Sequence, residues 1–265
     1  MRVRHLSFLR RHGLTCVLAV VLTGCASVGT DEPVVSEISH TAWARSTLPA
    51  GSRMPWTHQT FPGKRASHYQ YERKDGRDAL MAQAVSSASM LRQMVRVEPE
   101  HLGQLRFSWM VPTLIEAADL AHRDGDDSPV RVVLAFAGDR ARFSAKDAAL
   151  SELSELLTGE PLPYATLMYV WCNQRASETV ILNPRTNRIR KLVMETGEGR
   201  LNRWLDYERD VRADYIKAFG EPPGALLAIG IMTDTDNTRS QAQAWYGALE
   251  HRPQRRAQQQ TALGD

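Results

Sequence analysis

Apolar and polar residues alternate along short stretches of the central part of this chain. In residues 104–111 (QLRFSWMV), apolar side chains occupy every second position, while Arg106 and Ser108 fall between them. A period of two residues predicts a strand with one buried face. Similar runs, separated by turns, cover residues 68–72, 80–84, 89–97, 129–137, 164–172, 178–182, 188–195 and 225–233. About nine such strands predict a mainly β, jelly-roll-like β-sandwich.

One turn has a specific signature. Asp75-Gly76 stands between the runs at 68–72 and 80–84. Asp-Gly is favoured where a two-residue turn needs positive φ angles, so the two runs are predicted to form a hairpin.

Two segments carry a helical pattern instead. Ser144 and Asp147 resemble a capping box, and leucines follow at helical spacing up to Gly159. The second segment extends from residue 202 to 219, with large apolar side chains three or four positions apart and a stop at Gly220. The sandwich is therefore expected to have one or two flanking helices.

The N-terminus predicts export. Arginines precede an apolar stretch at residues 14–22, which is too short to span a bilayer, and Leu22-Thr23-Gly24-Cys25 follows. This order resembles a bacterial lipoprotein signal peptide, which implies that residues 1–24 are removed and that Cys25 carries lipid. Ala26 after the cysteine, by resemblance to lipoprotein sorting, favours the outer membrane, facing the periplasm.

The rest of the chain divides by composition. Residues 25–52 predict a lipidated tether, residues 53–251 a β-sandwich domain, and residues 252–265 a disordered tail. Beyond Cys25 only Cys172 remains, so no disulfide is expected within the domain, and Cys172 is interpreted as a small buried apolar residue.

The net charge of the chain bears on whether it binds nucleic acid. The whole chain has 33 Lys+Arg and 30 Asp+Glu, but four of the arginines lie in the leader, which contains no acidic residue. The remaining chain is nearly neutral, so it lacks the excess of positive charge that drives nucleic-acid binding. No nucleic-acid partner is expected.

Several local sequences resemble the domain-of-unknown-function family 3047, a group of exported bacterial proteins. The densest match extends from WLDYERDVRADYIKAFG, beginning at Trp204, to IGIMTDTDNT, ending at Thr238; weaker matches include Phe107-Ser108-Trp109 and Tyr169-Val170-Trp171. The resemblance implies a jelly-roll-like sandwich akin to galactose-binding domains. It implies no established activity, so no catalytic residue is carried over.

An acidic turn follows the run at 225–233. Asp234, Asp236 and Asn237 place three side-chain oxygen donors within four residues, which suits calcium. Arg239 stands where an EF-hand loop would have glycine, so that motif is absent. An Asx turn that closes a strand is the alternative, and a catalytic role is a third. The acidic loop 122–127 would add ligands if it folded against Asp234.

Two further sets of residues are candidates for a site. Trp56, Trp171 and Trp245 are possible flat platforms for sugar rings, whereas Trp109 and Trp204 are expected in the core. Glu208 and Asp214, on the second predicted helix, are an alternative acid pair for hydrolysis. No GxSxG or HExxH motif is present.

Three functions remain open. The first is a lipid-anchored, non-catalytic module that binds an envelope glycan or another ligand, with no cofactor beyond a structural calcium. The second is a structural partner of an envelope protein. The third is an envelope polysaccharide hydrolase that uses paired carboxylates. The absence of a catalytic motif favours a protein that is not an enzyme.

Overall fold

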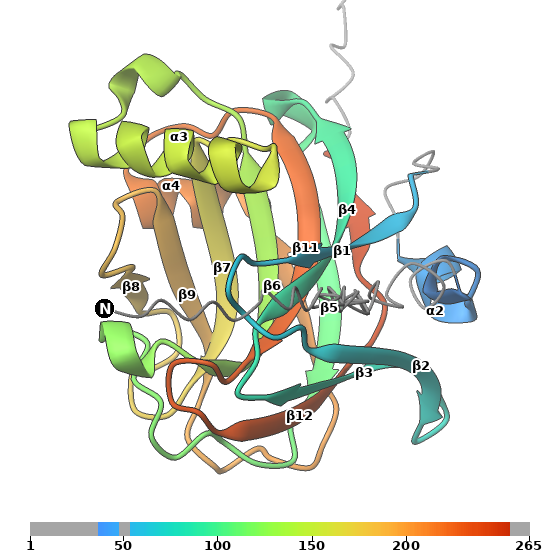
Figure 1. The fold of residues 1–265 in the computed structure, drawn as a ribbon. Coiled ribbons are helices and arrows are strands. Elements are labelled where there is room, and N and C mark those ends of the chain that lie inside the picture. Colours follow the sequence, from blue (N-terminus) through green and yellow to red (C-terminus); the bar gives the residue numbers. More distant parts are fainter. Residues whose placement is uncertain (1–36, 48–53, 255–265) are drawn as a thin grey trace, which may run out of the picture.

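Two β-sheets pack face to face in the computed structural model, which describes residues 37–47 and 54–254 (Figure 1). Within these residues, all strand pairs are antiparallel except β7 with β9. Sheet A has the order β1 (Trp56–Thr60), β4 (Ser89–Val97), β11 (Leu226–Asp234), β6 (Ser128–Phe136), β7 (Ala165–Cys172), β9 (Ile189–Thr196) and β8 (Val180–Leu182). Sheet B has the order β10 (Leu205–Asp210), β5 (Gln104–Met110), β12 (Gln241–Tyr246), β3 (Arg77–Val85) and β2 (His68–Lys74), and β13 (Glu250–Arg252) also pairs with β5.

The connectivity is that of a jelly roll. Strands β3 to β6 alternate between the two sheets, so that β3-β12-β5-β10 packs against β4-β11-β6-β7. Double-sheet jelly rolls bury one face of each strand in the shared core. The predicted fold class is confirmed.

Aromatic side chains fill much of the space between the sheets. Phe107 of β5 stacks on Tyr169 of β7, with ring centroids 5.3 Å apart, and also lies 5.1 Å from Trp109. The alternation read from residues 104–111 is thus confirmed, since the apolar set is buried and Arg106 points away. Cys172 is free and buried, as expected of a small apolar residue.

The predicted hairpin is confirmed between β2 and β3. Their turn places Asp75 and Gly76 at φ values of 50° and 78°. These are the positive φ values that a type I′ turn requires at both central positions.

The first predicted helix is confirmed as α3 (Ala145–Thr158), which runs across one end of sheet A (Figure 1). The Ser144 hydroxyl accepts a hydrogen bond from the backbone N–H of Asp147, over 3.1 Å. Gly159 ends the helix in the left-handed conformation.

The second predicted helix begins too early. Residues 205–210 form strand β10, and α4 (Val211–Phe219) starts only after Asp210, whose side chain caps Ala213 N. The sequence LDYERD also alternates, with Leu205 buried in the core and Tyr207 half-buried against it. Pairing with β5 satisfies the backbone hydrogen bonds of residues 205–210. These contacts with a distant strand outweigh the helical spacing of the apolar residues.

Part of the predicted tether belongs to the fold. Helix α2 (Ala42–Ser46) packs on the sandwich, because Trp43 is fully buried, lies 4.9 Å from Trp56 and donates its indole N–H to Gly247 O over 3.0 Å. At the other end, β13 carries the fold to Arg252. Residues 1–24, Cys25 and the segment from residue 255 lie outside the described residues.

Within the described residues, no helix combines the length and apolar character needed to cross a bilayer.

Candidate functional site

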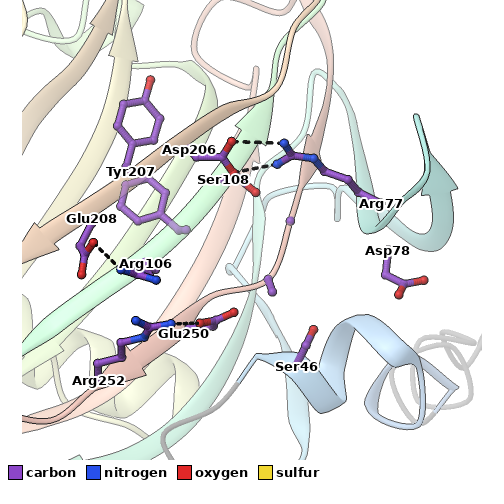
Figure 2. Close-up of a pocket in the computed structure, with 13 residues that line it drawn as sticks. Ser46, Arg77, Asp78, Arg106, Ser108, Asp206, Tyr207, Glu208, Glu250 and Arg252 are labelled. Carbon is purple, nitrogen blue, oxygen red and sulfur yellow. Dashed lines mark hydrogen bonds and ion pairs between the residues drawn. The ribbon is translucent and has the colours of Figure 1, made fainter.

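An open groove of about 620 Å³ lies on the face of sheet B that points away from the core (Figure 2). Strands β5 and β10 form part of its wall, and the chain from Gly247 to Arg252 crosses it. Ser46 of α2 lies at its border, so the helix outside the predicted domain contributes to the site.

Alternation along β5 and β10 builds the first polar pair of the groove. Arg106 is directly opposite Glu208 in the antiparallel register, and Arg106 Nη2 donates to Glu208 Oε2 over 2.8 Å. The neighbours of Arg106 along β5 are buried and those of Glu208 along β10 are half-buried, so these two side chains point outward. The hydrogen bond from Arg106 lowers the pKa of Glu208, which therefore stays ionised at neutral pH.

A second pair bridges the groove. Arg77 at the start of β3 donates to both carboxylate oxygens of Asp206, over 2.7 and 3.2 Å. Two parallel hydrogen bonds fix the guanidinium plane as well as its position. Arg252 and Glu250 form a third pair at 3.4 Å, and Figure 2 shows all three pairs across the same surface.

The charges of the groove are nearly balanced. Three arginines, Arg77, Arg106 and Arg252, face four carboxylates, those of Asp78, Asp206, Glu208 and Glu250. Guanidinium groups supply donors only and carboxylates acceptors only. A hydroxyl both donates and accepts, so a neutral polyhydroxylated ligand can hydrogen-bond to both members of each pair.

The groove depends on a glycine. A Cβ atom on Gly247 would lie 2.1 Å from Ser108 Oγ and 3.6 Å from the Trp204 ring. Gly247 N also donates to Ser108 O over 2.9 Å. Any larger residue would push this segment out of the groove.

Two tryptophans lie beside the charged pairs, on the outer face of sheet B. Trp245 and Trp204 belong to a small cluster with Ala79, Met81 and Met110. Lys74 Nζ lies 4.6 Å from the centroid of Trp245, and the Arg77 guanidinium lies 5.2 Å from that of Trp204. The cations cover the rings and hold them against the sheet.

The predicted tryptophan platforms are corrected by burial. Trp56, Trp171 and Trp245 are 2%, 1% and 8% exposed, and a buried ring has no free face for a sugar. Trp56 packs between α2 and the core, and Trp171 donates its indole N–H to Gly197 O. Trp109 is buried as predicted, whereas Trp204 is half-buried and lies on the outer face.

The predicted acid pair does not form. Glu208 lines the groove, but Asp214 is buried on α4, where it accepts hydrogen bonds from Tyr169 and Arg209. Burial, reinforced by Asp214, raises the pKa of Tyr169 well above its ordinary value. The Asp214 carboxylate is thus a structural acceptor in the interior and does not face Glu208.

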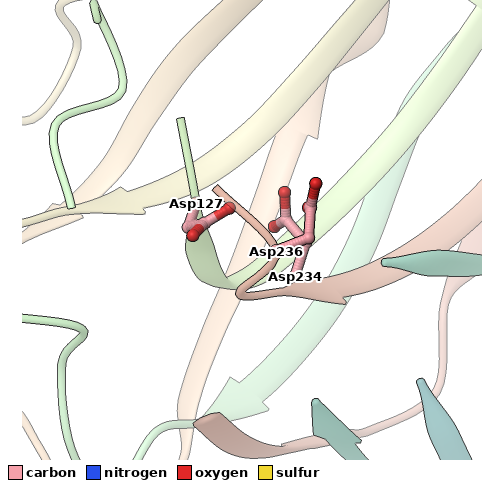
Figure 3. Close-up of side chains that lie close together, drawn as sticks. All are labelled: Asp127, Asp234 and Asp236. Carbon is pink, nitrogen blue, oxygen red and sulfur yellow. The ribbon is translucent and has the colours of Figure 1, made fainter. Parts of the chain in front are cut away.

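The predicted acidic turn is closed by a buried network. Asp127, from the acidic loop 122–127, lies close to Asp234 and Asp236, as expected for a loop that folds against the turn (Figure 3). Asp127 accepts hydrogen bonds from the backbone N–H groups and side chains of Asn237 and Thr238. The acceptor lies about 110 residues from the turn along the chain, so this is a long-range closure and not the local Asx turn predicted as the alternative.

Cations hold the other carboxylates. Arg131 is buried and donates to both oxygens of Asp234, over 2.7 and 3.0 Å, and to Asp126 over 3.1 Å. Lys191 is also buried and lies 2.6 Å from Asp126. Burial, with the nearby Arg131 charge, lowers the pKa of Lys191 to about 8.

These residues do not fit the predicted calcium site. Asp236 pairs with Lys64, the carboxylates of Asp127 and Asp234 already accept N–H and O–H groups, and Asn237 donates its amide to Asp127. Calcium needs six to eight oxygen ligands with free lone pairs. The geometry instead makes the cluster a structural ion network.

The groove residues were accessible to sequence reasoning only in part. The outward positions of residues 104–111 already included Arg106 and Ser108. Asp206 was missed because residues 205–210 were predicted to be helical, and Glu208 was predicted as a site residue but with Asp214 as its partner instead of Arg106. Arg77 and Glu250 carry no local motif, since only the strand order of sheet B brings them to the same surface.

The comparisons with known proteins give a family. The model described as "Protein of unknown function (DUF3047)" matches residues 54–250. Among curated proteins, no match is found.

Two solved structures are similar to most of this chain at a low level. The xyloglucanase domain of NopAA, a type three effector from Sinorhizobium fredii, is 8% identical with a TM-score of 0.41, over 75% of this chain and 93% of that one. The family 11 carbohydrate-binding module of the cellulosomal cellulase Lic26A-Cel5E of Clostridium thermocellum is 8% identical with a TM-score of 0.35, over 77% and 91%. Likeness at this level leaves the function to be argued from the chain's own site.

Proposed function

The chain belongs to the DUF3047 family, and from the groove that its fold builds we propose that it is a non-catalytic, glycan-binding β-sandwich. The ligand would be a neutral, polyhydroxylated glycan of the cell envelope. The observation that carries the proposal is the row of arginine–carboxylate pairs across the outer face of sheet B.

The pairs suit binding better than hydrolysis. A general acid needs a carboxyl group with a raised pKa, whereas Arg106 lowers the pKa of Glu208. Asp206 is held bidentately by Arg77, so its oxygens are fixed acceptors. Fixed donors and acceptors lower the cost of ordering side chains when a ligand binds.

The test is binding to purified peptidoglycan and to an array of envelope glycans. The full chain is expected to bind a subset of these, and Arg106→Gln is expected to weaken binding about tenfold or more, because hydrogen bonds from a charged donor are lost. Binding is measured by pull-down and then by titration with the best array ligand.

A matched control is available outside the groove. Arg96 pairs with Glu98 at 2.8 Å on an exposed surface, as Arg106 does with Glu208. Arg96→Gln should leave glycan binding unchanged. The proposal fails if the chain retains no glycan, or if Arg106→Gln binds as well as Arg96→Gln.

We also propose that the domain is attached to the outer membrane through lipid on Cys25 and faces the periplasm. The basic leader, the apolar stretch and the Leu22–Cys25 sequence support this. Cys25→Ala is expected to move the protein from the membrane fraction to the soluble fraction of the cell. Retention of this variant in the membrane fraction would contradict lipid attachment at Cys25.

A further inference from the structure

A second groove lies on the opposite side of the molecule, between α3 and the outer face of sheet A. Its volume is about 720 Å³, within the range of pockets that enclose small ligands. Helix α3 forms one wall, the segment around Phe61 and Pro62 another, and residues 160–164 line a further part. It shares no lining residue with the glycan groove.

The floor of this groove is apolar, in contrast to the outer face of sheet B. Its strands present methionines and small residues, among them Met90, Met168, Met232, Ala135 and Ala228. Methionine is flexible and polarizable, so it adapts to apolar ligands of irregular shape. An apolar surface of this kind, left outside the core, indicates a binding site.

Helix α3 turns its leucines toward this groove. Leu150, Leu153 and Leu157 line it, yet Leu153 and Leu157 remain 51% and 60% exposed. The buried residues of α3 are polar: Asp147 bonds to Ser144 and Thr186, and Ser151 accepts from Arg140. An amphipathic helix normally buries its leucines, so here polar contacts anchor the helix and leave the leucine face free for a ligand.

The rim carries positive charge. Arg92 and Arg140 line the groove, and Glu160, which pairs with Arg92 at 2.6 Å, is the only acidic residue among the lining residues. An anionic group at one end of an apolar ligand would therefore meet a net positive rim.

The volume of the groove distinguishes between two apolar ligands, a helix of a partner protein and a hydrocarbon chain. A three-turn helix with its side chains fills on the order of 1,300 Å³, about twice the groove. A linear hydrocarbon chain is thin enough to lie along the methionine floor. We propose that this groove binds the acyl chain of a single-chain anionic amphiphile, with its head group at Arg140 and Arg92.

The experiment titrates the full chain carrying Cys25→Ala, so that no acyl group of its own competes. Saturated fatty acids of ten, twelve and fourteen carbons are used as probes. Each two added methylenes should tighten binding roughly fifteenfold while the groove still covers them. Arg92→Gln, which leaves the contacts that anchor α3 in place, should weaken dodecanoate binding and leave dodecanol binding unchanged, since only the acid carries a charge.

Two leucines of one helix provide a matched pair of variants. Leu153→Asn, in the groove, should weaken dodecanoate binding at least tenfold, whereas Leu156→Asn should have no effect, because Leu156 is 84% exposed and does not line the groove. Ala228→Phe, which fills the floor, should abolish binding. If that variant does not fold, the exposed Leu153 variant still decides the question.

Phosphatidylglycerol vesicles distinguish the source of the chain. Tight dodecanoate binding that is lost in Leu153→Asn assigns the groove to a free acid. Co-sedimentation with vesicles but no dodecanoate binding, lost in the same variant, would overturn the single-chain proposal and assign the groove to a bilayer lipid. Absence of both, or binding that Leu153→Asn and Leu156→Asn affect equally, overturns the proposal.

Discussion

Arg131→Met is expected to lower the free energy of unfolding by about 3–5 kcal/mol. Arg131 is buried and pairs with both Asp234 and Asp126, so its removal takes the ion-pair partner from buried Asp234 and leaves Asp126 with Lys191. Methionine keeps most of the side-chain length and can pack beside Met168. The lowered free energy of unfolding is therefore due mainly to the missing charge, and only to a small extent to a cavity.

The effect is measured by urea unfolding at pH 7.5, with Arg106→Met as the matched control. Arg106 pairs with a carboxylate over a similar distance but is exposed, and surface ion pairs contribute little because water screens them. Equal losses in the two variants would show that the buried network is not held together by its charges.

The pH dependence of the Arg131 variant has a defined sign. Burial raises the pKa of Asp234 to about 7 even beside Arg131, and without the arginine it rises further above the unfolded value. The folded variant then binds a proton that the unfolded chain lacks, so its stability increases as the pH falls from 8 toward 5. The difference from the native chain should shrink over the same range.

The strands of this fold were the most predictable part, for a physical reason. Each strand of a sandwich buries one face. The alternation of apolar and polar residues in a strand such as β4 (Ser89–Val97) therefore predicts that strand without knowledge of its partners. The residues from 202 to 219 were ambiguous because spacings of three and four coexist there with alternation. Pairing with β5, which no local pattern reveals, decided in favour of a strand up to Asp210.

Sites were less predictable because they depend on contacts between distant residues. The acidic turn at Asp234 was found as a cluster, and its closeness to loop 122–127 was anticipated. Arg131, which lies 103 residues from Asp234 along the chain, pairs with it and makes the cluster an ion network, and Lys191 pairs with Asp126 of the same cluster. Likewise, the presence of a tryptophan in the sequence does not show whether its side chain is buried. Trp171 belongs to the core because its side chain lies inside the sandwich.

The segment before residue 54 is expected to contribute strongly to the stability of the fold. We compare a chain that begins at residue 54, where the family match begins, with one that begins at residue 37. The free energy of unfolding of the shorter chain is expected to be lower by about 3–5 kcal/mol. The shorter chain lacks Trp43, which is fully buried against Trp56 and donates to Gly247 O. Trp43→Ala in the longer chain should reproduce most of the loss.

Thermal melting of the shorter chain should show a midpoint lower by roughly 6 to 20 °C. Arg45→Ala serves as the control on the same helix, because Arg45 is exposed and its substitution should change stability by no more than about 0.5 kcal/mol. Because Trp43 holds Gly247, which keeps the charged groove open, the shorter chain should also bind glycan more weakly. Equal midpoints for the two chains would return residues 37–47 to the role of a tether and separate α2 from the groove.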